Sequence, residues 1–332
     1  MPAQLRPAGI VGTGSCLPER VVTNAELERI VDTSDEWIRT RTGIRERRLA
    51  GPDTAASDLA VPAAVKALDR AGIRPEDLDL IIVATVTPDT LFPATACLVQ
   101  ERLGARGAAA FDLSAGCSGF IYGLAVANQF ISTGVYRTAV VIGVEILSKI
   151  INWQDRNTCV LFGDGAGAVV LQAVAPGEGI LGLHLGADGN GGNLLSIPAG
   201  GSRLPASPDS VREQLHTIHM NGPEVFKFAV RIMGEASLKA LEQAGLTRAD
   251  VDFLIPHQAN IRIIEAATKR LGLAPEKVYV NLHRYGNMSS ASIPVALDEA
   301  CREGRLHRGD RVVLVAFGAG LTWGAAVLRW SL

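Results

Sequence analysis

The chain has 332 residues, of which 48% are hydrophobic and 20% charged, and its formal net charge at pH 7 is −2. This composition excludes a disordered chain and suits two domains or one duplicated domain. The near-neutral charge argues against a dedicated nucleic-acid binder.

The N-terminal sequence has no apolar core of the kind found in a signal peptide. No apolar run approaches the roughly 20 residues that a membrane-spanning helix needs. The scattered cysteines lack CxxC spacing, which argues against a disulfide framework or a zinc site and for a reducing compartment. They are Cys16, Cys97, Cys117, Cys159 and Cys301. We therefore expect a cytoplasmic protein that is not bound to a membrane and holds no metal.

Residues 38–49 contain a run of arginines, namely Arg39, Arg41, Arg45, Arg47 and Arg48. Such a run is usually a solvated surface, but it can also hold an anionic ligand. The residues alone leave both interpretations open.

An internal repeat organises the rest of the chain. Residues 66–82 recur as residues 239–255, at an offset of 239 − 66 = 173. Residues 102–104 are matched by 270–272, and residues 167–171 by 324–328. Three matches in the same order indicate two copies of one unit.

Each copy predicts the order helix, strand, helix, strand, helix, strand, strand. In the first copy we expect helices at 57–72, 93–104 and after Cys117, and strands at 79–86, 108–113, 137–145 and 166–172. In the second we expect helices at 224–245, 260–271 and 289–303, and strands at 251–256, 277–281, 310–317 and 323–330. This alternation predicts an α/β fold with largely parallel, buried sheets. Residues 175–209 are rich in Gly, Pro, Ser and Asn and predict loops, so we divide the chain into halves 1–175 and 176–332.

Cys117 lies at the junction between strand 108–113 and the following helix. Unpaired N–H groups and the helix dipole at such a junction favour a thiolate. Gly116 and Gly119 have no β-carbon, so a substrate carbonyl could approach the backbone. Most cysteines are nevertheless small buried hydrophobes, and position alone does not make Cys117 a nucleophile.

Two segments of the second copy offer partners for Cys117. One strand breaks at Pro256 and is followed by His257, and the tight turn Gly286-Asn287 precedes a helix where the Cys117 junction recurs. A lone histidine is more often structural, and Gly-Asn is more often only a turn. Ligands of duplicated α/β folds bind at strand ends near the junction of the halves, which favours a shared site.

Other motifs give weaker evidence of function. Gly163-Asp-Gly-Ala-Gly167 is not a dinucleotide loop, because a strand follows it instead of a helix. His216 and His219 have metal-like spacing without further ligands, and we expect them to be structural. We also expect Cys16, Cys97, Cys159 and Cys301 to be core residues.

Several further motifs span the whole chain. They are Gly12-Thr-Gly14, Thr33-Ser-Asp-Glu-Trp37, Arg41-Thr-Gly-Ile-Arg45-Glu-Arg47, His257-Gln-Ala-Asn260 and Phe317-Gly-Ala-Gly-Leu-Thr-Trp-Gly324. With these motifs the sequence resembles the β-ketoacyl-acyl-carrier-protein synthase III family of the thiolase superfamily. The resemblance implies a thiolase-like five-layered α-β-α-β-α fold built from two duplicated halves. It also implies decarboxylative condensation of a short acyl-CoA with malonyl-acyl-carrier protein at the start of type II fatty acid synthesis.

The resemblance assigns roles to single residues. It implies that Cys117, His257 and Asn287 are catalytic, that the N–H groups of Cys117 and Gly318 stabilise an oxyanion, and that Phe317 shapes the site. It implies CoA contacts by Thr33, Trp37, Arg41, Arg156, Gly222 and Asn260. Pro223 stands where another family member has a CoA-contacting asparagine, which is a departure from the pattern.

The resemblance also implies partners but no cofactor. An acidic acyl-carrier protein would dock on the surface around the tunnel mouth, with contacts from Lys227, Gln258, Ala259, Asn260, Ile261, Arg262, Lys269 and Arg270. The protein would form a homodimer in which Phe92 reaches the acyl pocket of the partner. Two alternatives remain: a related enzyme with another acceptor, and a non-catalytic acyl-CoA-binding protein. Asn287 argues against the first, and the complete set of Cys117, His257 and Asn287 argues against the second.

Overall fold

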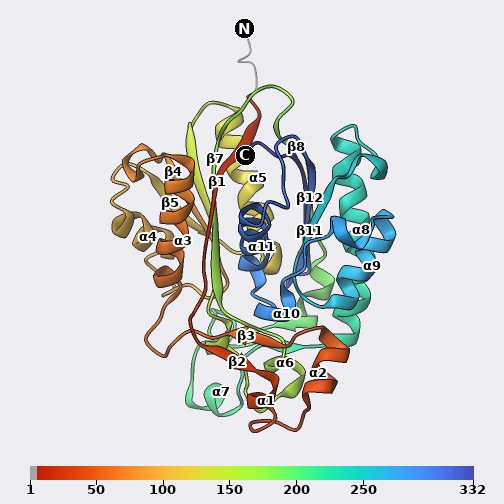
Figure 1. Cartoon of the computed structure of the whole chain (residues 1–332). Helices are drawn as coiled ribbons and strands as arrows, with labels where there is room; N and C mark the ends of the chain where they lie inside the picture. The colour runs from red at the N-terminus through yellow and green to blue at the C-terminus, as the bar shows by residue number, and fades with distance from the viewer. Residues whose placement is uncertain (1–5) are drawn as a thin grey trace.

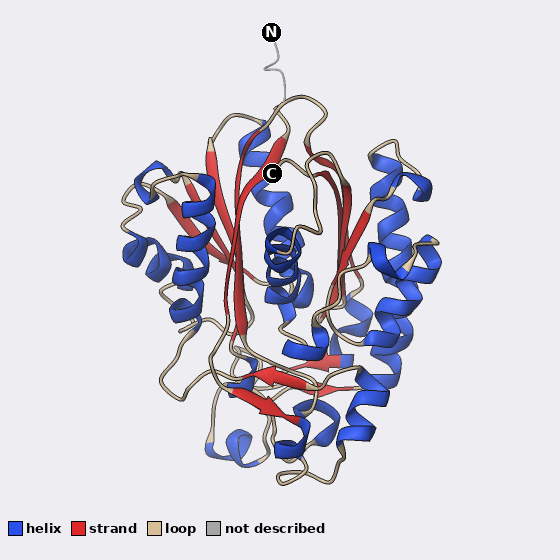
Figure 2. Cartoon of the chain, viewed as in Figure 1, coloured by secondary structure: helices blue, strands red, loops and turns tan. Residues whose placement is uncertain are grey.

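A computed structural model of the chain describes residues 6–332. Two β-sheets and three layers of helices alternate through the molecule (Figures 1 and 2). Helices α3 and α4 form one outer layer, α8 and α9 form the other, and α5 and α11 lie between the sheets. The predicted five-layered α/β fold is confirmed.

The elements before residue 175 form the first main sheet, a separate two-stranded sheet and their helices. In chain order they are β1 (Ala8–Cys16), β2 (Val21–Thr23), α1 (Asn24–Leu27), α2 (Asp35–Thr42), β3 (Glu46–Arg48), α3 (Ala56–Ala71), β4 (Leu80–Ala84), α4 (Thr95–Leu103), β5 (Ala109–Leu113), α5 (Gly119–Ser132), β6 (Thr138–Glu145), α6 (Arg156–Cys159) and β7 (Gly165–Ala173).

The remaining elements form the second main sheet, another separate two-stranded sheet and their helices. They are β8 (Gly179–Ala187), β9 (Leu195–Ser196), α7 (Pro208–Arg212), β10 (His219–Met220), α8 (Gly222–Gln243), β11 (Phe253–Pro256), α9 (Ile261–Leu271), α10 (Leu282–Tyr285), α11 (Ser292–Arg302), β12 (Arg311–Gly318) and β13 (Thr322–Arg329).

The two sheets have the same strand order, but they are not largely parallel. The first runs β1-β7-β6-β4-β5 and the second β8-β13-β12-β11. Only the pairs β6–β4, β4–β5 and β11–β12 are parallel, and the others are antiparallel. The expectation of largely parallel sheets was wrong because no helix crosses over between the last two strands of each half. A short turn joins β12 directly to β13, and such a turn can only link antiparallel strands.

Strand β8 was missed, because residues 175–209 were expected to be loops. Its glycines hide the strand pattern, and packing requires them. A β-carbon on Gly182 would overlap with the carbonyl of Ala240 in α8, and one on Gly186 would overlap with the ring of Trp323. Glycine in a strand often marks such a close approach.

The strand expected at residues 277–281 does not form. Only one bridge, between Leu254 and Val278, occupies the position that β5 has in the first sheet. The second sheet therefore lacks a full counterpart of β5. All other helices and strands expected in the two copies are present within a few residues of their expected bounds.

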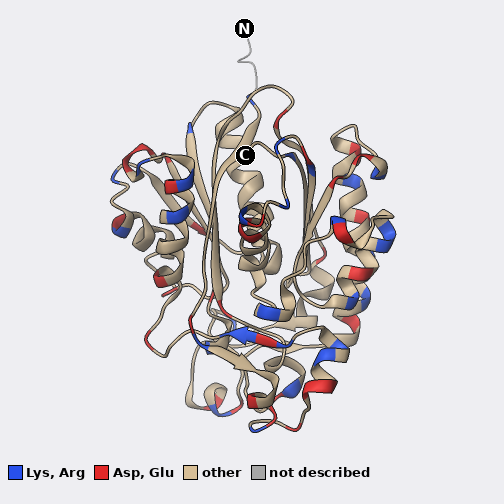
Figure 3. Cartoon of the chain, viewed as in Figure 1, with Lys and Arg blue, Asp and Glu red and all other residues tan. Residues whose placement is uncertain are grey.

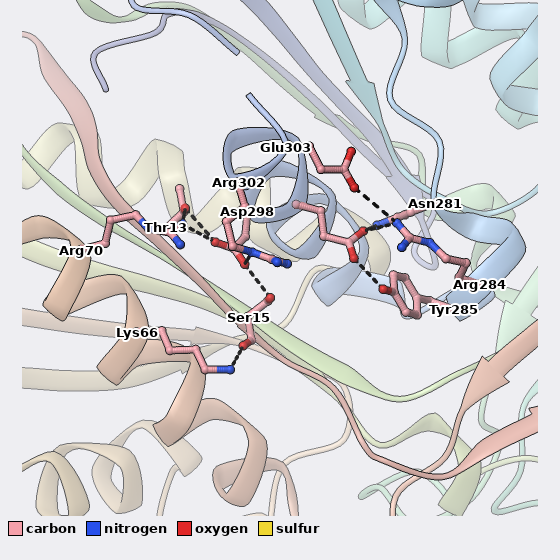
Figure 4. A network of polar contacts seen from close by, with 11 residues as sticks. Thr13, Ser15, Lys66, Arg70, Asn281, Arg284, Tyr285, Asp298, Arg302 and Glu303 are labelled. Atoms are coloured by element: carbon pink, nitrogen blue, oxygen red, sulfur yellow. Dashed lines mark hydrogen bonds and ion pairs between the residues drawn. The ribbon is translucent and has the colours of Figure 1, made fainter. Parts of the chain in front are cut away.

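The middle layer connects the halves. Helix α11 is almost fully buried, and it begins after the 3₁₀ turn Ser289–Ala291, next to the beginning of α5. At its other end Asp298 accepts hydrogen bonds from Thr13 and Ser15 of β1 and forms ion pairs with Arg70 and Arg302 (Figure 4). This polar network joins α11 to the first sheet.

Charged residues are concentrated on the outer helices, and the strands of the two main sheets contain few of them (Figure 3). Helix α9 ends in the basic residues Lys269 and Arg270. Within residues 6–332, none of the helices combines the length and the apolar composition needed to cross a membrane.

Candidate active site

Cys117 lies in a 3₁₀ turn, Gly116–Ser118, which joins β5 to α5. It therefore precedes the α-helix proper instead of lying in its first turn. The loop after β12 packs tightly against this turn. A β-carbon on Gly318 would overlap with the backbone N of Cys117, and one on Gly116 would lie 2.8 Å from the N of Ala319. Only glycine at both positions allows the two backbone segments to come this close.

A cavity of about 210 Å³ opens beside Cys117. Apart from Ser196 and Ser289, its lining is mainly aliphatic or aromatic, which suits an acyl chain better than a polar ligand. The lining residues are Val86, Gly116, Cys117, Leu147, Ile150, Phe162, Leu195, Ser196, Ile197, Ile218, Ser289 and Ala319.

The surroundings of Cys117 favour the neutral thiol. Burial raises its pKa to about 12, and the charge of Glu145 acts in the same direction, whereas a hydrogen bond with Ser289 lowers it. The expectation that the helix start favours a thiolate is therefore outweighed by burial. In the unliganded protein at neutral pH the residue is a thiol.

His257 follows β11 and is 1% exposed. Its backbone N–H donates to the carbonyl of Val315, at 2.8 Å, which fixes the residue at the end of β12. Burial lowers the pKa of the imidazole to about 3, so the ring is neutral at physiological pH. Neither ring nitrogen has a hydrogen-bond partner within residues 6–332, and the ring packs edge-on against Phe317 with centroids 5.8 Å apart. An unpaired buried imidazole is costly unless a ligand completes its hydrogen bonds.

Asn287 lies between Gly286 and the 3₁₀ turn that precedes α11. Its backbone forms a bridge with Phe162, and its N–H donates to the carbonyl of Leu161 at 2.8 Å. The side-chain carbonyl oxygen accepts the N–H of Ser289, also at 2.8 Å. This contact fixes the orientation of the amide, and the NH₂ group is left to donate to another partner.

Short contacts link the three residues that were expected to be catalytic. Cys117 touches Gly318, which follows Phe317, and Phe317 packs against His257. On the other side Cys117 hydrogen-bonds with Ser289, which is held by Asn287. The three residues are thus connected through their neighbours, and of the three Cys117 lines the cavity.

A second cavity of about 640 Å³, with polar and apolar side chains in its lining, lies next to the first. Leu161 and His219 line it, and their neighbours Phe162 and Ile218 line the Cys117 cavity. Its lining includes two residues expected to bind CoA, Trp37 and Gly222, and also Pro223.

The other residues expected to bind CoA lie close by. The guanidinium of Arg156 stacks over the Trp37 ring, 5.1 Å from its centroid. Asn260 donates to the backbone carbonyl of Arg41 at 3.0 Å, and the guanidinium of Arg41 is exposed. The Oγ1 atom of Thr33 is buried and has no partner among the described residues.

Residues expected to contact the carrier protein lie on α8 and α9, with one clear exception. Gln258 is fully buried, and its amide is occupied by backbone groups of Pro256, Tyr279, Asn281 and Leu282. The expected docking contact of Gln258 is therefore wrong, and Ala259, 9% exposed, has little surface to offer.

The remaining members of this group reach the surface at least in part. Arg262 stacks on Phe226 with its guanidinium 4.9 Å from the ring centroid, and Asn260 and Ile261 are half-buried. Lys227, Lys269 and Arg270 are exposed. Lys227 pairs with Glu224 at 2.7 Å, whereas Arg270 lies 4.0 Å from Glu235.

Two other expectations need correction. In the arginine run, Arg47 is fully buried and donates to the carbonyls of Val22 and Val160, so it neither faces solvent nor reaches a ligand. Cys97 is exposed instead of buried, and its sulfur lies 3.8 Å from the carbonyl of Ala110 in the edge strand β5. His216 and His219 hydrogen-bond to Ser210 and Gln214, and residues 6–332 contain no cluster of metal-ligating side chains.

The sequence analysis missed three residues beside Cys117. Ser289 and Ala319 line the cavity, and Ser289 has φ = +45°, a strained backbone for a residue with a side chain. Glu145 is fully buried nearby. A signal for Glu145 was available, since a lone carboxylate ends the otherwise uncharged strand 138–145.

Comparisons with known proteins agree with this geometry. The family model described as 3-oxoacyl-[acyl-carrier-protein] synthase III matches residues 111–189, and the model of its C-terminal part matches residues 241–330. A β-ketoacyl-[acyl-carrier-protein] synthase III of Symbiobacterium thermophilum is 66% identical over 328 residues, which cover 99% of each chain. That of Caldanaerobacter subterraneus subsp. tengcongensis is 64% identical over 324 residues, 98% of each chain. The solved structure of a Thermus thermophilus β-ketoacyl-[acyl-carrier-protein] synthase III matches with a TM-score of 0.91 at 52% identity, covering 97% of this chain and 99% of that one.

Proposed function

The chain belongs to the 3-oxoacyl-[acyl-carrier-protein] synthase III family, and on that premise we propose that Cys117, His257 and Asn287 carry out its reaction. The protein is an acyltransferase that condenses a short acyl-CoA primer, such as acetyl-CoA, with malonyl-acyl-carrier protein. The products are 3-oxoacyl-acyl-carrier protein, CO₂ and CoA, and the step initiates type II fatty acid biosynthesis. The observation that carries the assignment of roles is the position of Cys117 on the wall of an apolar cavity.

In the first half-reaction, the sulfur of Cys117 attacks the thioester carbonyl of the acyl-CoA. The C–S bond to CoA breaks, and the thiol proton of Cys117 ends on the departing CoA sulfur. The oxyanion that forms needs preorganised donors. The N–H groups of Cys117 and Gly318 are our candidates, and the tight packing of these two segments supports them. Ala319, which also lines the cavity, offers a third N–H.

In the second half-reaction, malonyl-acyl-carrier protein loses CO₂ and leaves an enolate. Neutral His257 can donate one hydrogen bond to the enolate oxygen, and the NH₂ group of Asn287 can donate another. The depressed pKa of His257 and the fixed amide of Asn287 support these roles. The enolate carbon then attacks the acyl carbonyl, a C–C bond forms, and the Cys117 thiolate leaves. No step of this scheme uses a cofactor.

The cavity beside Trp37 is our candidate entry path for CoA. Arg156 already stacks on Trp37 at 5.1 Å, so the two planar groups would have to move apart for an adenine to stack between them. Gly222 and Asn260 would line the pantetheine path, Arg41 would face phosphate, and Thr33 has an unpaired hydroxyl to offer.

We place carrier-protein docking on the exposed basic surface of α8 and α9. Lys227, Arg262, Lys269 and Arg270 remain in this proposal, with Asn260 and Ile261 at the edge, because an acidic partner is attracted to such a surface. Gln258 is removed from it, and Ala259 contributes little. We also propose that the enzyme acts in the cytoplasm, where unpaired thiols persist.

We further propose a division into halves at residues 175 and 176, and a homodimer. Strand β7 of the first sheet ends at Ala173, and β8 of the second sheet begins at Gly179. The dimer is supported by the loop before α4, where Leu91 and Phe92 are each 84% exposed. Two large apolar side chains exposed side by side are typical of an interface.

The catalytic assignment is tested by the mass of the intact protein after incubation with acetyl-CoA and longer or branched acyl-CoAs. The mass should rise by one acyl group, and Cys117→Ala should abolish the rise. Cys97→Ala is the matched control, because it removes an exposed thiol and should still be acylated. Acylation that persists in Cys117→Ala would overturn the assignment.

A further inference from the structure

Glu145 ends β6 and is fully buried, although no cation balances it. No Lys, Arg or His forms an ion pair with it within residues 6–332. The elements around its carboxyl are β4, residues 85–87 and the 3₁₀ turn Ser289–Ala291, and they contribute hydroxyl and N–H groups but no charged side chain. Cys117 is the titratable group that the charge of Glu145 would influence. An unpaired buried carboxylate is expensive, and such groups usually take up a proton.

The two oxygens of this carboxyl have different surroundings. Oε2 accepts the hydroxyl of Thr87 at 2.7 Å and the backbone N–H of Val86 at 3.1 Å, and the hydroxyl of Thr85 lies at 3.3 Å. Oε1 contacts the hydroxyl of Ser290 at 2.9 Å, and the side chain of Ser289 also hydrogen-bonds to the carboxyl. Three donors lie within 3.3 Å of Oε2.

The position of a proton follows from the contacts of Ser290. Its hydroxyl lies 2.7 Å from the carbonyl of Ala84 and 2.9 Å from Oε1 of Glu145, but a hydroxyl has only one proton to donate. If Oε1 carries a proton, it donates to Ser290, and Ser290 donates to Ala84. Both contacts are then hydrogen bonds. If Glu145 is ionised, Ser290 can donate its single proton either to Oε1 or to the carbonyl of Ala84. The other contact is then not a hydrogen bond.

In the internal repeat, Ser290 and Glu145 correspond to Cys117 and to a residue that packs against it. The turn Gly116–Ser118 corresponds to the turn Ser289–Ala291, and β6 corresponds to β12, each pair 173 residues apart. Ser290 is therefore the counterpart of Cys117, and Glu145 is the counterpart of Gly318. Gly318 packs against the start of α5 beside Cys117, and Glu145 bonds to the start of α11 beside Ser289. The carboxyl thus ties Val86 and the Ser289–Ser290 turn together, and Val86 and Ser289 both line the Cys117 cavity.

We propose that Glu145 is a positioning residue, held as the neutral acid, whose carboxyl fixes two walls of the Cys117 cavity without placing a charge beside the sulfur. The proposal rests on Cys117 being the nucleophile proposed above. Burial raises the pKa of Glu145, although hydrogen bonds from Thr87, Val86, Ser290 and Ser289 oppose this rise. A neutral acid also spares Cys117 a repulsive charge when its thiolate forms.

Glu145→Gln, Glu145→Ala and the wild type are compared in a Cys97→Ala background, which removes the exposed thiol. The rate at which iodoacetamide alkylates Cys117 is measured by peptide mass between pH 7 and pH 9, and the rate of acylation by acetyl-CoA is measured separately. Glutamine has the donor and acceptor pattern of the neutral acid, so Glu145→Gln should keep both rates within about a factor of two. Glu145→Ala should lose at least about tenfold in acylation, because displaced walls misalign the attack.

Two possible results with the Glu145→Gln variant would overturn the proposal. If Glu145 were ionised, the substitution would remove a negative charge beside the thiol and raise alkylation about tenfold for each unit by which the pKa falls. Acylation as poor as that of Glu145→Ala would show that the amide does not replace the acid. Wild-type acylation by Glu145→Ala would likewise exclude a positioning role.

Infrared spectroscopy keeps the proposal testable if Glu145→Ala does not fold. The C=O band of a protonated carboxylic acid should be present in the wild type and missing in Glu145→Gln, and its absence from the wild type would overturn the proposal. Asp298→Asn is the control for loss of another buried carboxyl, and its alkylation rate should match the wild type. Failure of the wild type to accept an acyl group would reject the proposed role of Cys117 and leave the alkylation comparison intact.

Discussion

Burial acts on Cys117 and His257 in opposite directions, because it disfavours the charged form of each. It raises the pKa of the thiol to about 12 and lowers that of the imidazole to about 3. Both residues are therefore uncharged at neutral pH, and they do not form a resting thiolate–imidazolium pair. A neutral His257 is better suited to donate a hydrogen bond to an enolate than to carry an extra proton as an imidazolium.

This difference predicts a division of labour between the catalytic residues. His257→Ala and Asn287→Ala should still be acylated by acyl-CoA, but each should release CO₂ from malonyl-acyl-carrier protein roughly 10²–10³ times more slowly, the usual cost of one oxyanion donor. Intact mass measures the first step and CO₂ release the second. An equal loss of both steps would mean that the two residues only hold the site together.

At the residue scale, the sequence predicted which side chains share a site but not their protonation. Strand ends and the internal repeat grouped Cys117, His257 and Asn287, and their catalytic roles stay a prediction. The expected thiolate failed because burial, which a local pattern does not reveal, outweighs the dipole of the following helix. The same limit explains Gln258, whose amide is saturated by backbone groups from residues 256–282.

At the scale of elements, the repeat predicted the helices and most strands, while glycines and turns concealed the rest. Gly182 and Gly186 concealed β8 because they accommodate a helix and an indole ring. Strand direction also required knowing that a turn of residues 319–321, with no helix, joins β12 to β13. Neither fact is local to the strand that it affects.

The polar contacts of Asp298 in helix α11 lead to a prediction about stability. Asp298, with a side chain 3% exposed, holds α11 to β1 and α3 through Thr13, Ser15 and Arg70 (Figure 4). Asp298→Ala should lower the free energy of unfolding by about 2–4 kcal/mol in urea titrations at fixed protein concentration, since it leaves buried donors unpaired while its arginine partners stay partly solvated. Asp209→Ala, which breaks an exposed pair with Arg212, should cost less than about 1 kcal/mol.

The effect of Asp298 should depend on pH in a defined direction. Burial alone would raise the pKa of this carboxyl, but hydrogen bonds from Ser15 and Thr13 and the charges of Arg302 and Arg70 hold it below its usual value. Its contribution is therefore complete above the unfolded pKa of about 3.9 and is lost as the pH falls through the lower folded value. The difference between wild type and Asp298→Ala should shrink below about pH 4, and a difference that grows there would contradict this account.

At the scale of the whole molecule, one edge of the first sheet looks unfinished. Strand β5 pairs only with β4, and none of its residues is fully buried. The loop that leads into the neighbouring α4 exposes Leu91 and Phe92. An open sheet edge beside exposed apolar side chains is rarely left uncovered, which supports a second copy of the chain at this place.

Phe92 tests this interpretation. It does not fill the core of its own chain, since 84% of it is exposed, so Phe92→Ala should not destabilise the isolated fold. If Phe92 instead reaches the acyl pocket of a partner, the variant should remain a dimer in light scattering and accept longer or bulkier acyl-CoAs in the acylation assay. Val135→Ala, which removes another exposed apolar side chain, should leave acyl preference unchanged. A fully active monomer at assay concentration would exclude the shared pocket, because no partner would then be present to supply Phe92.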